Sequence, residues 1–273
     1  MSLMPPYSQS PPENNATAPA GIATVDRARH AARGEHKREY VQAMFSDIAP
    51  RYDLLNHILS LNIDKGWRRR ALAALNWIRV PSGRYLDLCA GTLDVGALLG
   101  RQRGFSGFIV GADFALSMLQ HGAGKAPPTV LAPVAADALA LPMASATFDG
   151  AIVAFGIRNV ADIDAGLREV RRLLRPGARF VILEFSTPSS ALVRRFYHAY
   201  FHFVLPFVGR MVSGHTSAYT YLPLSVADFP TRDALAARMI AAGFVKVTWQ
   251  PLTLGIAAIH VGEVPAHPAP LFA

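Results

Sequence analysis

From about residue 84 to the end of the chain, short apolar runs alternate with segments whose apolar residues recur every three or four positions. The runs are typical of buried strands, and the recurring pattern is typical of helices that pack on one face. Seven strands are predicted, over residues 85–89, 107–112, 130–135, 148–154, 178–184, 244–249 and about 254–262. Helices are predicted over residues 94–101, 115–123, 162–174, about 189–208 and 231–242, with turns at 81–83 and 175–177 and irregular chain from 208 to about 228. This alternation predicts an α/β fold with a doubly wound, mostly parallel sheet.

The last two predicted strands differ from the others because no helix separates them. They are joined through Pro251, closely enough to form a hairpin, so the last strand is expected to run antiparallel. A final helix followed by such a hairpin resembles the ending of class I S-adenosylmethionine-dependent methyltransferases.

The N-terminal part has another pattern. Residues 1–36 are rich in Pro, Ser, Asn and Ala and then become charged, so this tail cannot bury a core and is expected to be disordered. A helical period follows from about Glu35 and ends at Pro50, and a second one, interrupted near 62–64, runs to about residue 75. These helices are expected to cap a single domain over 37–264. Residues 265–273 are expected to be a loose tail.

Composition narrows the class of protein. With 273 residues, 51% of them hydrophobic, the chain has room for one full core. The net charge of +8 suggests an anionic partner, although surplus arginine on a solvated surface explains it equally well. The single cysteine, Cys89, excludes an internal disulfide and disfavours a cysteine metal cluster. No secretion signal and no apolar run of about 18 residues is evident, so a cytoplasmic protein is expected.

The stretch Arg84–Gly96, RYLDLCAGTLDVG, carries the first chemical signal. A strand, a tight turn and a helix start can hold a nucleotide-like ligand at the carboxyl end of a parallel strand. Gly91 lets the backbone pass close to a ligand, and Thr92 follows it. The other glycines of a dinucleotide fingerprint are replaced by Cys89 and Leu93, so an ordinary strand-to-helix turn stays an alternative.

Acids mark three successive strands. Asp87 lies in the first strand, and we expect it to meet the ammonium group of a ligand's amino-acid end. Asp113 ends the second strand, 22 positions after Gly91, where a carboxylate can accept both ribose hydroxyls. Asp137 follows the third strand and can accept from the exocyclic amine of adenine. Helix capping is the alternative for each acid, but it explains three consecutive strand ends less well.

After the fourth predicted strand the chain reads AFGIRNV, which places Arg158 and Asn159 where a substrate would lie. This segment, together with YDLLNHILSLNIDKGWRR, LDLCAGTLD, LRPGARFVILEFSTP and AYTYL in the same order, resembles the ubiquinone/menaquinone biosynthesis C-methyltransferase family. The resemblance covers roughly residues 40–262. The Tyr-Asp-x-x-Asn and Phe-Gly-x-Arg-Asn-Val segments are signatures of that family.

The chain departs from the family pattern in its glycine-rich loop. Where the family reads Gly-Gly-Thr-Gly-Asp, this chain has Ala90-Gly91-Thr92-Leu93-Asp94. Leu93 is the most serious change, since a residue with a side chain does not adopt a positive φ cheaply. Because the central Gly91 survives, we expect a local loop variant that still binds the cofactor. Ala154 and Ala218 also stand where the family often has Ser.

The resemblance implies a seven-stranded class I methyltransferase that transfers a methyl group from S-adenosylmethionine to a ring carbon of a prenylated quinol, without a metal. Demethylmenaquinol is the expected substrate, and 2-polyprenyl-6-methoxy-benzoquinol or another small phenol is the alternative. Arg158 and Asn159 are expected to stabilise charge on the phenolic oxygen, with a salt bridge from Arg158 to an acid such as Asp162 as the alternative. The cofactor is expected to contact Asp87, Gly91, Thr92, Asp113, Phe114, Asp137, Ala138 and Ala154. The quinol is expected to contact Tyr52, Tyr219 and Tyr221, although tyrosines two positions apart are also typical of a half-buried strand.

The segment RRFYHAYFHFVLPFVGRMV predicts either a core helix or a lid that admits a prenyl tail and rests on a membrane surface. The expected partners are therefore a prenylated quinol, the inner face of the membrane and a second copy of the chain. A nucleic-acid-binding or RNA-modifying protein is disfavoured because the arginines are dispersed. A nicotinamide-dependent oxidoreductase is disfavoured by the missing glycines and the antiparallel ending.

Overall fold

The computed structural model describes residues 37–53, 60, 62–200 and 217–266. The expected tail over residues 1–36 lies outside this range, as does nearly all of the expected C-terminal tail. Residues 201–216, which hold the second half of the helix predicted to run to about 208, also lie outside it.

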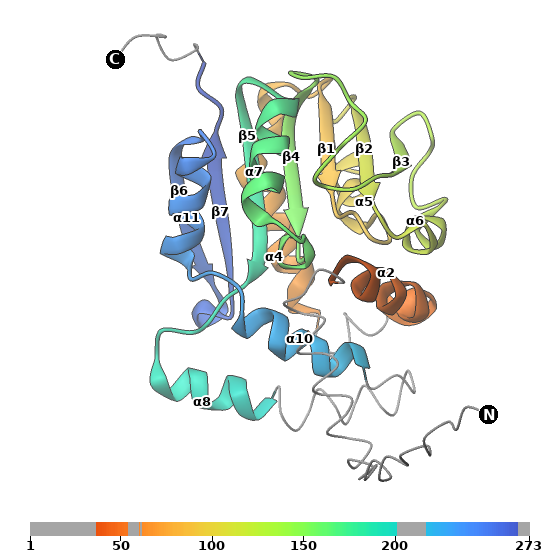
Figure 1. Ribbon diagram of the computed structural model, residues 1–273. Helices are drawn as coiled ribbons and strands as arrows, with labels where there is room; N and C mark the ends of the chain where they lie inside the picture. Colours follow the sequence, from red (N-terminus) through yellow and green to blue (C-terminus); the bar gives the residue numbers. More distant parts are fainter. Residues whose placement is uncertain (1–36, 54–59, 61, 201–216, 267–273) are drawn as a thin grey trace, which may run out of the picture.

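A seven-stranded sheet forms the centre of the molecule, with strands in the order β3-β2-β1-β4-β5-β7-β6 (Figure 1). Its strands are β1 (Arg84–Leu88), β2 (Phe108–Asp113), β3 (Leu131–Ala135), β4 (Phe148–Ala154), β5 (Leu174–Phe185), β6 (Val245–Leu252) and β7 (Ala257–Glu263). The first five strands are parallel to one another, and β7 lies antiparallel between β5 and β6. The predicted doubly wound sheet with an antiparallel last strand is confirmed.

Helices cover both faces of the sheet and its carboxyl-terminal edge (Figure 1). They are α2 (Lys37–Ile48), α4 (Ile63–Leu75), α5 (Asp94–Gly100), α6 (Leu116–Gly122), α7 (Ile163–Leu173), α8 (Ala191–Ala199), α10 (Ser217–Ala227) and α11 (Arg232–Ala241). Short 3-10 turns are η1 (Ala49–Arg51), η2 (Trp77–Arg79), η3 (Ile157–Asn159) and η5 (Thr253–Gly255).

The expectation of irregular chain up to about residue 228 is wrong for 217–227, which forms α10. Pro223 lies inside this helix and is normally a helix-breaking signal. Tertiary packing outweighs that signal: Tyr221 and Val226 are buried against Val41 and Met44 of α2.

The turn predicted at 175–177 is also different in the structure, because β5 already begins at Leu174. Leu174 pairs with Phe148, and the register then shifts before Arg179 pairs with Gly150. The Pro-Gly signal therefore marks an irregularity within a strand, where Gly177 has a φ of +80°.

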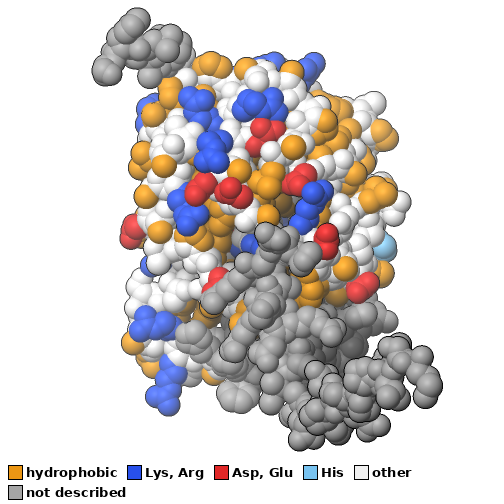
Figure 2. All heavy atoms as spheres, viewed as in Figure 1, with side chains coloured by type: hydrophobic (Ala, Val, Ile, Leu, Met, Phe, Trp, Pro, Cys, Tyr) orange, Lys and Arg blue, Asp and Glu red, His pale blue; other side chains and the backbone are white. Residues whose placement is uncertain are grey.

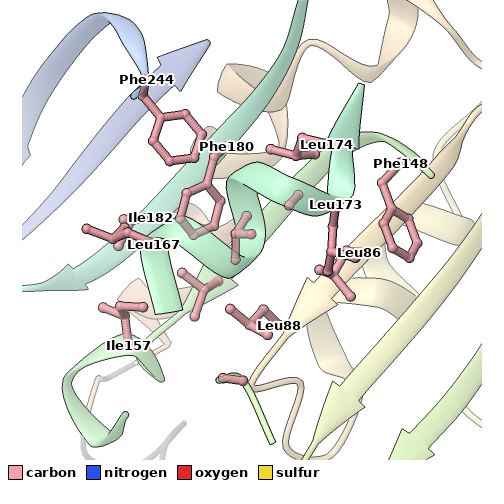
Figure 3. Close-up of a cluster of buried hydrophobic side chains, with 14 of the residues drawn as sticks. Leu86, Leu88, Phe148, Ile157, Leu167, Leu173, Leu174, Phe180, Ile182 and Phe244 are labelled. Carbon is pink, nitrogen blue, oxygen red and sulfur yellow. The ribbon is translucent and has the colours of Figure 1, made fainter. Parts of the chain in front are cut away.

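Two apolar clusters fill the space between the sheet and its helices. On one face, Leu86, Phe180 and Ile182 of the strands pack against Leu167 of α7 and further buried side chains (Figure 3). On the other face, Tyr85 and Val181 pack with Trp67 of α4 and its neighbours. Tyr85 and Leu86 belong to different clusters because successive side chains of a strand point to opposite faces.

Candidate active site

A pocket opens at the carboxyl ends of the parallel strands, beneath α2. Its walls combine the loops after β1, β2, β3 and β4 with side chains of the N-terminal cap. The lining residues include Arg38, Phe45, Tyr52, Cys89, Gly91, Asp113, Phe114, Met118, Asp137, Ala138, Ala154, Phe155, Gly156, Asn159 and Val160. Most of the residues predicted for cofactor contact thus converge here from four separate strand ends.

The loop between β1 and α5 bends through left-handed backbone at three positions, Cys89, Gly91 and Leu93, whose φ angles are +51°, +53° and +64°. Leu93 thus adopts the positive φ that its side chain was expected to resist. Its side chain is 2% exposed, and it fits where two glycines leave room. A Cβ at Gly111 would lie 2.4 Å from Leu93 Cδ2, and one at Gly122 would lie 2.9 Å from Leu93 Cγ. Burial of the leucine side chain offsets the backbone strain.

Asp113 lines the pocket with its carboxylate fixed by the backbone. Its Oδ1 accepts from the amide of Ala115 and its Oδ2 accepts from the amide of Gly91, both at 2.8 Å. Burial raises the pKa of Asp113 above its ordinary value, while these backbone hydrogen bonds act in the opposite direction. Asp113 is therefore a rigid acceptor facing the pocket.

Asp87 has a different environment from the one expected. It is 2% exposed, its Oδ2 accepts from the amide of Gly96 at 2.8 Å, and it does not line the pocket. Burial raises the pKa of Asp87 to about 7. The structure thus places Asp87 behind the loop, where it holds the start of α5.

Thr92 and Asp137 both contact the N-terminal cap. Thr92 is buried and donates its hydroxyl to Asp53, and it too lies outside the pocket lining. Asp137 lines the pocket, accepts from the amide of Leu139 at 3.0 Å and pairs with Arg38 of α2 at 3.2 Å. The carboxylate expected to meet an adenine amine is thus shared with the cap.

Arg158 lies in η3 and is 7% exposed. Its Nη1 pairs with Glu184 Oε1 at 2.8 Å and also donates to the carbonyl of Phe155. The salt-bridge alternative is therefore realised with Glu184 at the end of β5, whereas Asp162 caps α7 by accepting from the amide of Ala165. Burial raises the pKa of Glu184, and the positive charge of Arg158 opposes that shift.

Asn159, unlike Arg158, lines the pocket. Its Oδ1 accepts from the hydroxyl of Tyr221, 3.1 Å away on α10. Burial raises the pKa of Tyr221 to about 12, so its hydroxyl stays protonated and donates. Asn159 thus adds a polar group to the pocket lining, held in place by Tyr221.

The other two tyrosines are placed unequally. Tyr52 lines the pocket and packs edge-on against Phe45, with ring centroids 5.8 Å apart. Tyr219 lies in α10, and its side chain is outside the described part of the structure. The strand alternative for Tyr219 and Tyr221 is wrong. Both residues belong to α10, and the described one of the two side chains, Tyr221, lies against Asn159.

Sequence reasoning missed the contributions of α2 and β5. Arg38 and Phe45 line the pocket but lie far along the chain from the strands that form it. No local sequence pattern predicts a contact between such distant segments. Glu184 had a usable signal, because it is a further acid at the carboxyl end of a strand, like Asp113.

Comparison with known proteins adds to this geometry. Residues 33–264 match the model of the ubiE/COQ5 methyltransferase family. The chain belongs to this family. It is similar to the demethylmenaquinone methyltransferase of Thermus thermophilus, with 49% identity over 224 residues that span 81% of this chain and all of that one. The ubiquinone/menaquinone biosynthesis C-methyltransferase UbiE of Geobacter sulfurreducens is 44% identical over 242 residues, 87% of this chain and 93% of that one.

Solved structures bear out the fold. The [4+2]-cyclase SpnF superposes with a TM-score of 0.54 over 73% of this chain and 81% of its own, at 16% identity. A Haemonchus contortus phosphoethanolamine N-methyltransferase gives a TM-score of 0.53 over 72% of this chain and 52% of its own, at 14% identity. As a ubiE/COQ5 family member, the chain is a methyltransferase, and its cofactor is S-adenosylmethionine.

Two features are absent from the described residues. No helix among them is long and apolar enough to cross a membrane. Within the same part of the chain, His, Cys, Asp and Glu side chains form no group of three or more arranged to hold a metal ion.

Proposed function

We propose that this ubiE/COQ5 family protein methylates a ring carbon of a prenylated quinol, with demethylmenaquinol as its substrate. The observation that carries the proposal is the 49% identity to a protein named demethylmenaquinone methyltransferase, over that relative's whole length. The pocket supports it, since its aromatic and aliphatic side chains suit a quinol ring and Asn159, held by Tyr221, adds a polar group.

The pocket residues fit S-adenosylmethionine by the chemistry of their donors and acceptors. The fixed carboxylate of Asp113 suits a ribose diol, and Gly91 at φ +53° lets the backbone pass close by. Phe114, Met118 and Ala138 offer apolar contact for an adenine ring, with Asp137 as acceptor for its amine. When bound, this cofactor supplies the electrophilic methyl group.

The ring carbon becomes nucleophilic as the phenolic proton leaves and charge spreads into the ring. A hydrogen-bond donor beside the phenolic oxygen stabilises that charge. Because Asn159 Oδ1 is engaged by Tyr221, the Nδ2 group of Asn159 is the donor we place there. Arg158 acts through Asn159: its ion pair with Glu184 fixes η3, so we propose Arg158 as a positioning residue.

A second candidate substrate is 2-polyprenyl-6-methoxy-benzoquinol, because the relative from Geobacter sulfurreducens carries both quinone pathways in its name. Competition between the two quinols tests the choice. The purified protein is given methyl-labelled S-adenosylmethionine with equal amounts of both, and we expect label in menaquinol. Label mainly in the benzoquinol would favour the second candidate.

We further propose that the protein meets its lipid substrate at a membrane surface through α8. Leu192 is 66% exposed on this helix, and Arg194 and Arg195 are exposed beside it. Leu254, at the tip of the β6–β7 connection, is 76% exposed, and the adjoining Gly255 lies against Pro188 and Ser189 just before α8. Apolar and basic side chains together suit an anionic bilayer surface.

We also propose that the protein forms a homodimer. Light scattering of the purified chain tests this proposal.

A further inference from the structure

The segment from Lys37 to Asp53, which we call the strap, crosses the carboxyl-terminal edge of the sheet (Figure 1). Its side chains Arg38, Phe45 and Tyr52 line the pocket. Polar side chains of α2 join it to the loops after β4, β3 and β2. These contacts are Lys37 Nζ with the carbonyl oxygen of Arg158 (2.8 Å), Arg38 Nη1 with Asp137 Oδ2 (3.2 Å) and Gln42 Nε2 with the carbonyl oxygen of Phe114 (3.1 Å). The strap therefore contacts three of the four loops that build the pocket.

Asp53 extends this pattern to the loop after β1. Its Oδ1 accepts from Thr92 Oγ1 and its Oδ2 from Lys125 Nζ, each at 2.5 Å. Lys125 also pairs with Asp94, at 2.6 Å, at the start of α5. Through one carboxylate the strap is thus joined to the cofactor loop and to the helix that the loop begins.

The two contacts of Asp53 differ in how strongly they should hold the strap in place. The Asp53 and Lys125 side chains are 34% and 24% exposed, so water and salt screen their ion pair. Thr92 is 3% exposed, so water cannot replace the acceptor of its hydroxyl if Asp53 is removed. We therefore expect the contact between Asp53 and Thr92 to be the one that holds the strap against the loop after β1.

The neighbours of this pair connect it to the reaction. Tyr52 precedes Asp53 and lines the pocket, and Gly91, which also lines it, precedes Thr92. We propose that Asp53 is a positioning residue: through Thr92 it holds Tyr52 and the strap against the loop that binds the cofactor. When the bound cofactor orders the loop, it then also holds the strap closed. By thermodynamic reciprocity, a closed strap raises the affinity for the cofactor.

A double-mutant cycle tests this coupling in the full-length protein, with Asp53→Ala, Thr92→Val and both together. S-adenosylmethionine affinity is measured by calorimetry, and hydrogen exchange of residues 37–53 is followed with and without the cofactor. Each single variant should lower affinity about tenfold and remove the cofactor-induced protection of the strap, since the lost hydrogen bond has a charged acceptor. The double variant should lose no more than either single one, because both remove the same contact.

Asp164→Asn is the matched control, because it also removes one carboxylate charge from an ion pair, with Arg238, but at an exposed position of α7 outside the pocket lining. It should leave affinity and protection unchanged. The expected effect on the quinol rests on the proposed function: Asp53→Ala should raise the KM for the quinol several-fold more than it lowers kcat.

Three results would overturn the proposal. One is a folded Asp53→Ala protein with wild-type affinity while Thr92→Val alone is weakened, which would mean that Thr92 acts without Asp53. Another is additive losses in the double variant, and the third is a lower melting temperature with normal affinity and protection. If the wild-type protein methylates neither quinol, the proposed function fails, while affinity and exchange still decide the role of Asp53.

Discussion

Asp113 and Asp87 occupy neighbouring strands, yet their surroundings give them different roles. Asp113 faces the pocket with both oxygens held by backbone amides, whereas Asp87 is enclosed behind the loop and supports Gly96. The sequence placed both acids at the right edge of the sheet. It could not tell which one lines the pocket, because that depends on the three-dimensional path of the loop after β1.

The first prediction at this scale concerns Asp113. Asp113→Asn should weaken S-adenosylmethionine binding at least tenfold, because a charged acceptor contributes about 1.5–3 kcal/mol per hydrogen bond and the amide can accept through only one oxygen. Calorimetry of the folded variant measures this, with Asp164→Asn as a control for loss of charge. Unchanged affinity would remove Asp113 from the cofactor site.

Asp87 leads to a pH-dependent prediction. Its pKa is about 7 in the folded protein against 3.8 ordinarily, so between these values the folded state binds more protons than the unfolded one. The free energy of unfolding should therefore fall as pH rises through this window and level off above it. The Asp87→Asn variant keeps an oxygen that can accept from the amide of Gly96, but its side chain does not titrate in this pH range.

Urea unfolding of both proteins at several pH values from 4.5 to 8 checks this expectation. The stability of Asp87→Asn relative to wild type should increase as pH rises toward 7, with a slope of at most about 1.4 kcal/mol per pH unit. A constant difference across the range would show that Asp87 is ionised in the folded protein.

At the scale of elements, the loop after β1 shows how a side chain compensates for backbone strain. Leu93 keeps a φ of +64°, and its buried side chain fills the space beside Gly111 and Gly122. Leu93→Gly should therefore destabilise the protein despite relieving strain of about 1–2 kcal/mol, since loss of a buried leucine costs about 2–5 kcal/mol.

The glycine at 111 provides the matching test. Gly111→Ala alone should be strongly destabilising, because the new Cβ would lie 2.4 Å from Leu93 Cδ2. In the Leu93→Gly background the same substitution should cost much less. Chemical denaturation of the four proteins measures this coupling, and equal costs in both backgrounds would refute the packing account.

The ion pair between Arg158 and Glu184 joins η3 to the end of β5. Removal of Arg158 leaves a buried, uncompensated carboxylate, so Arg158→Ala should lower stability by about 3–5 kcal/mol as well as kcat. Arg158→Met with Glu184→Gln should recover much of the stability without restoring kcat. Urea unfolding and turnover on the same variants decide this; full turnover in the double variant would exclude a role for Arg158 in the reaction.

Local patterns predicted the elements well where one signal dominated. The strands β1 to β4 and helices α5 to α7 agree with the sequence within one or two residues, because apolar runs and turn residues coincide there. Prediction failed at α10, where packing on α2 overrides Pro223, and at the start of β5. It also missed Arg38, since contacts between distant segments leave no local pattern, and it left unused the strand-end signal of Glu184.

In the molecule as a whole, the distribution of surface charge indicates which kind of anionic partner is favoured, a nucleic acid or a membrane. Figure 2 shows Lys and Arg side chains interspersed with Asp and Glu over the visible described surface, with no single basic stripe. Such a face does not resemble a nucleic-acid footprint. We propose that part of the net charge of +8 acts through α8, where Arg194 and Arg195 are exposed.

Reversal of these two charges tests the membrane proposal. Arg194→Glu with Arg195→Glu should abolish most binding to vesicles that contain anionic lipid, because each basic residue near such a surface contributes about 1 kcal/mol. Cosedimentation measures the bound fraction, and Arg103→Glu with Arg238→Glu, at two exposed positions outside α8, serves as the charge-matched control. Equal binding of both variants and wild type would exclude α8 as the docking face.

The most direct test of the central claim is the identity of the methylated atom. The purified protein is incubated with S-adenosylmethionine carrying a carbon-13 methyl group and with demethylmenaquinol kept reduced, and the product is analysed by NMR and mass spectrometry. We expect one labelled methyl group on a ring carbon, with turnover lowered about 10²-fold or more in Asn159→Ala, the scale for loss of one donor to a developing oxyanion. A methyl group on a phenolic oxygen, or unlabelled quinol from protein that binds the cofactor, would contradict the account.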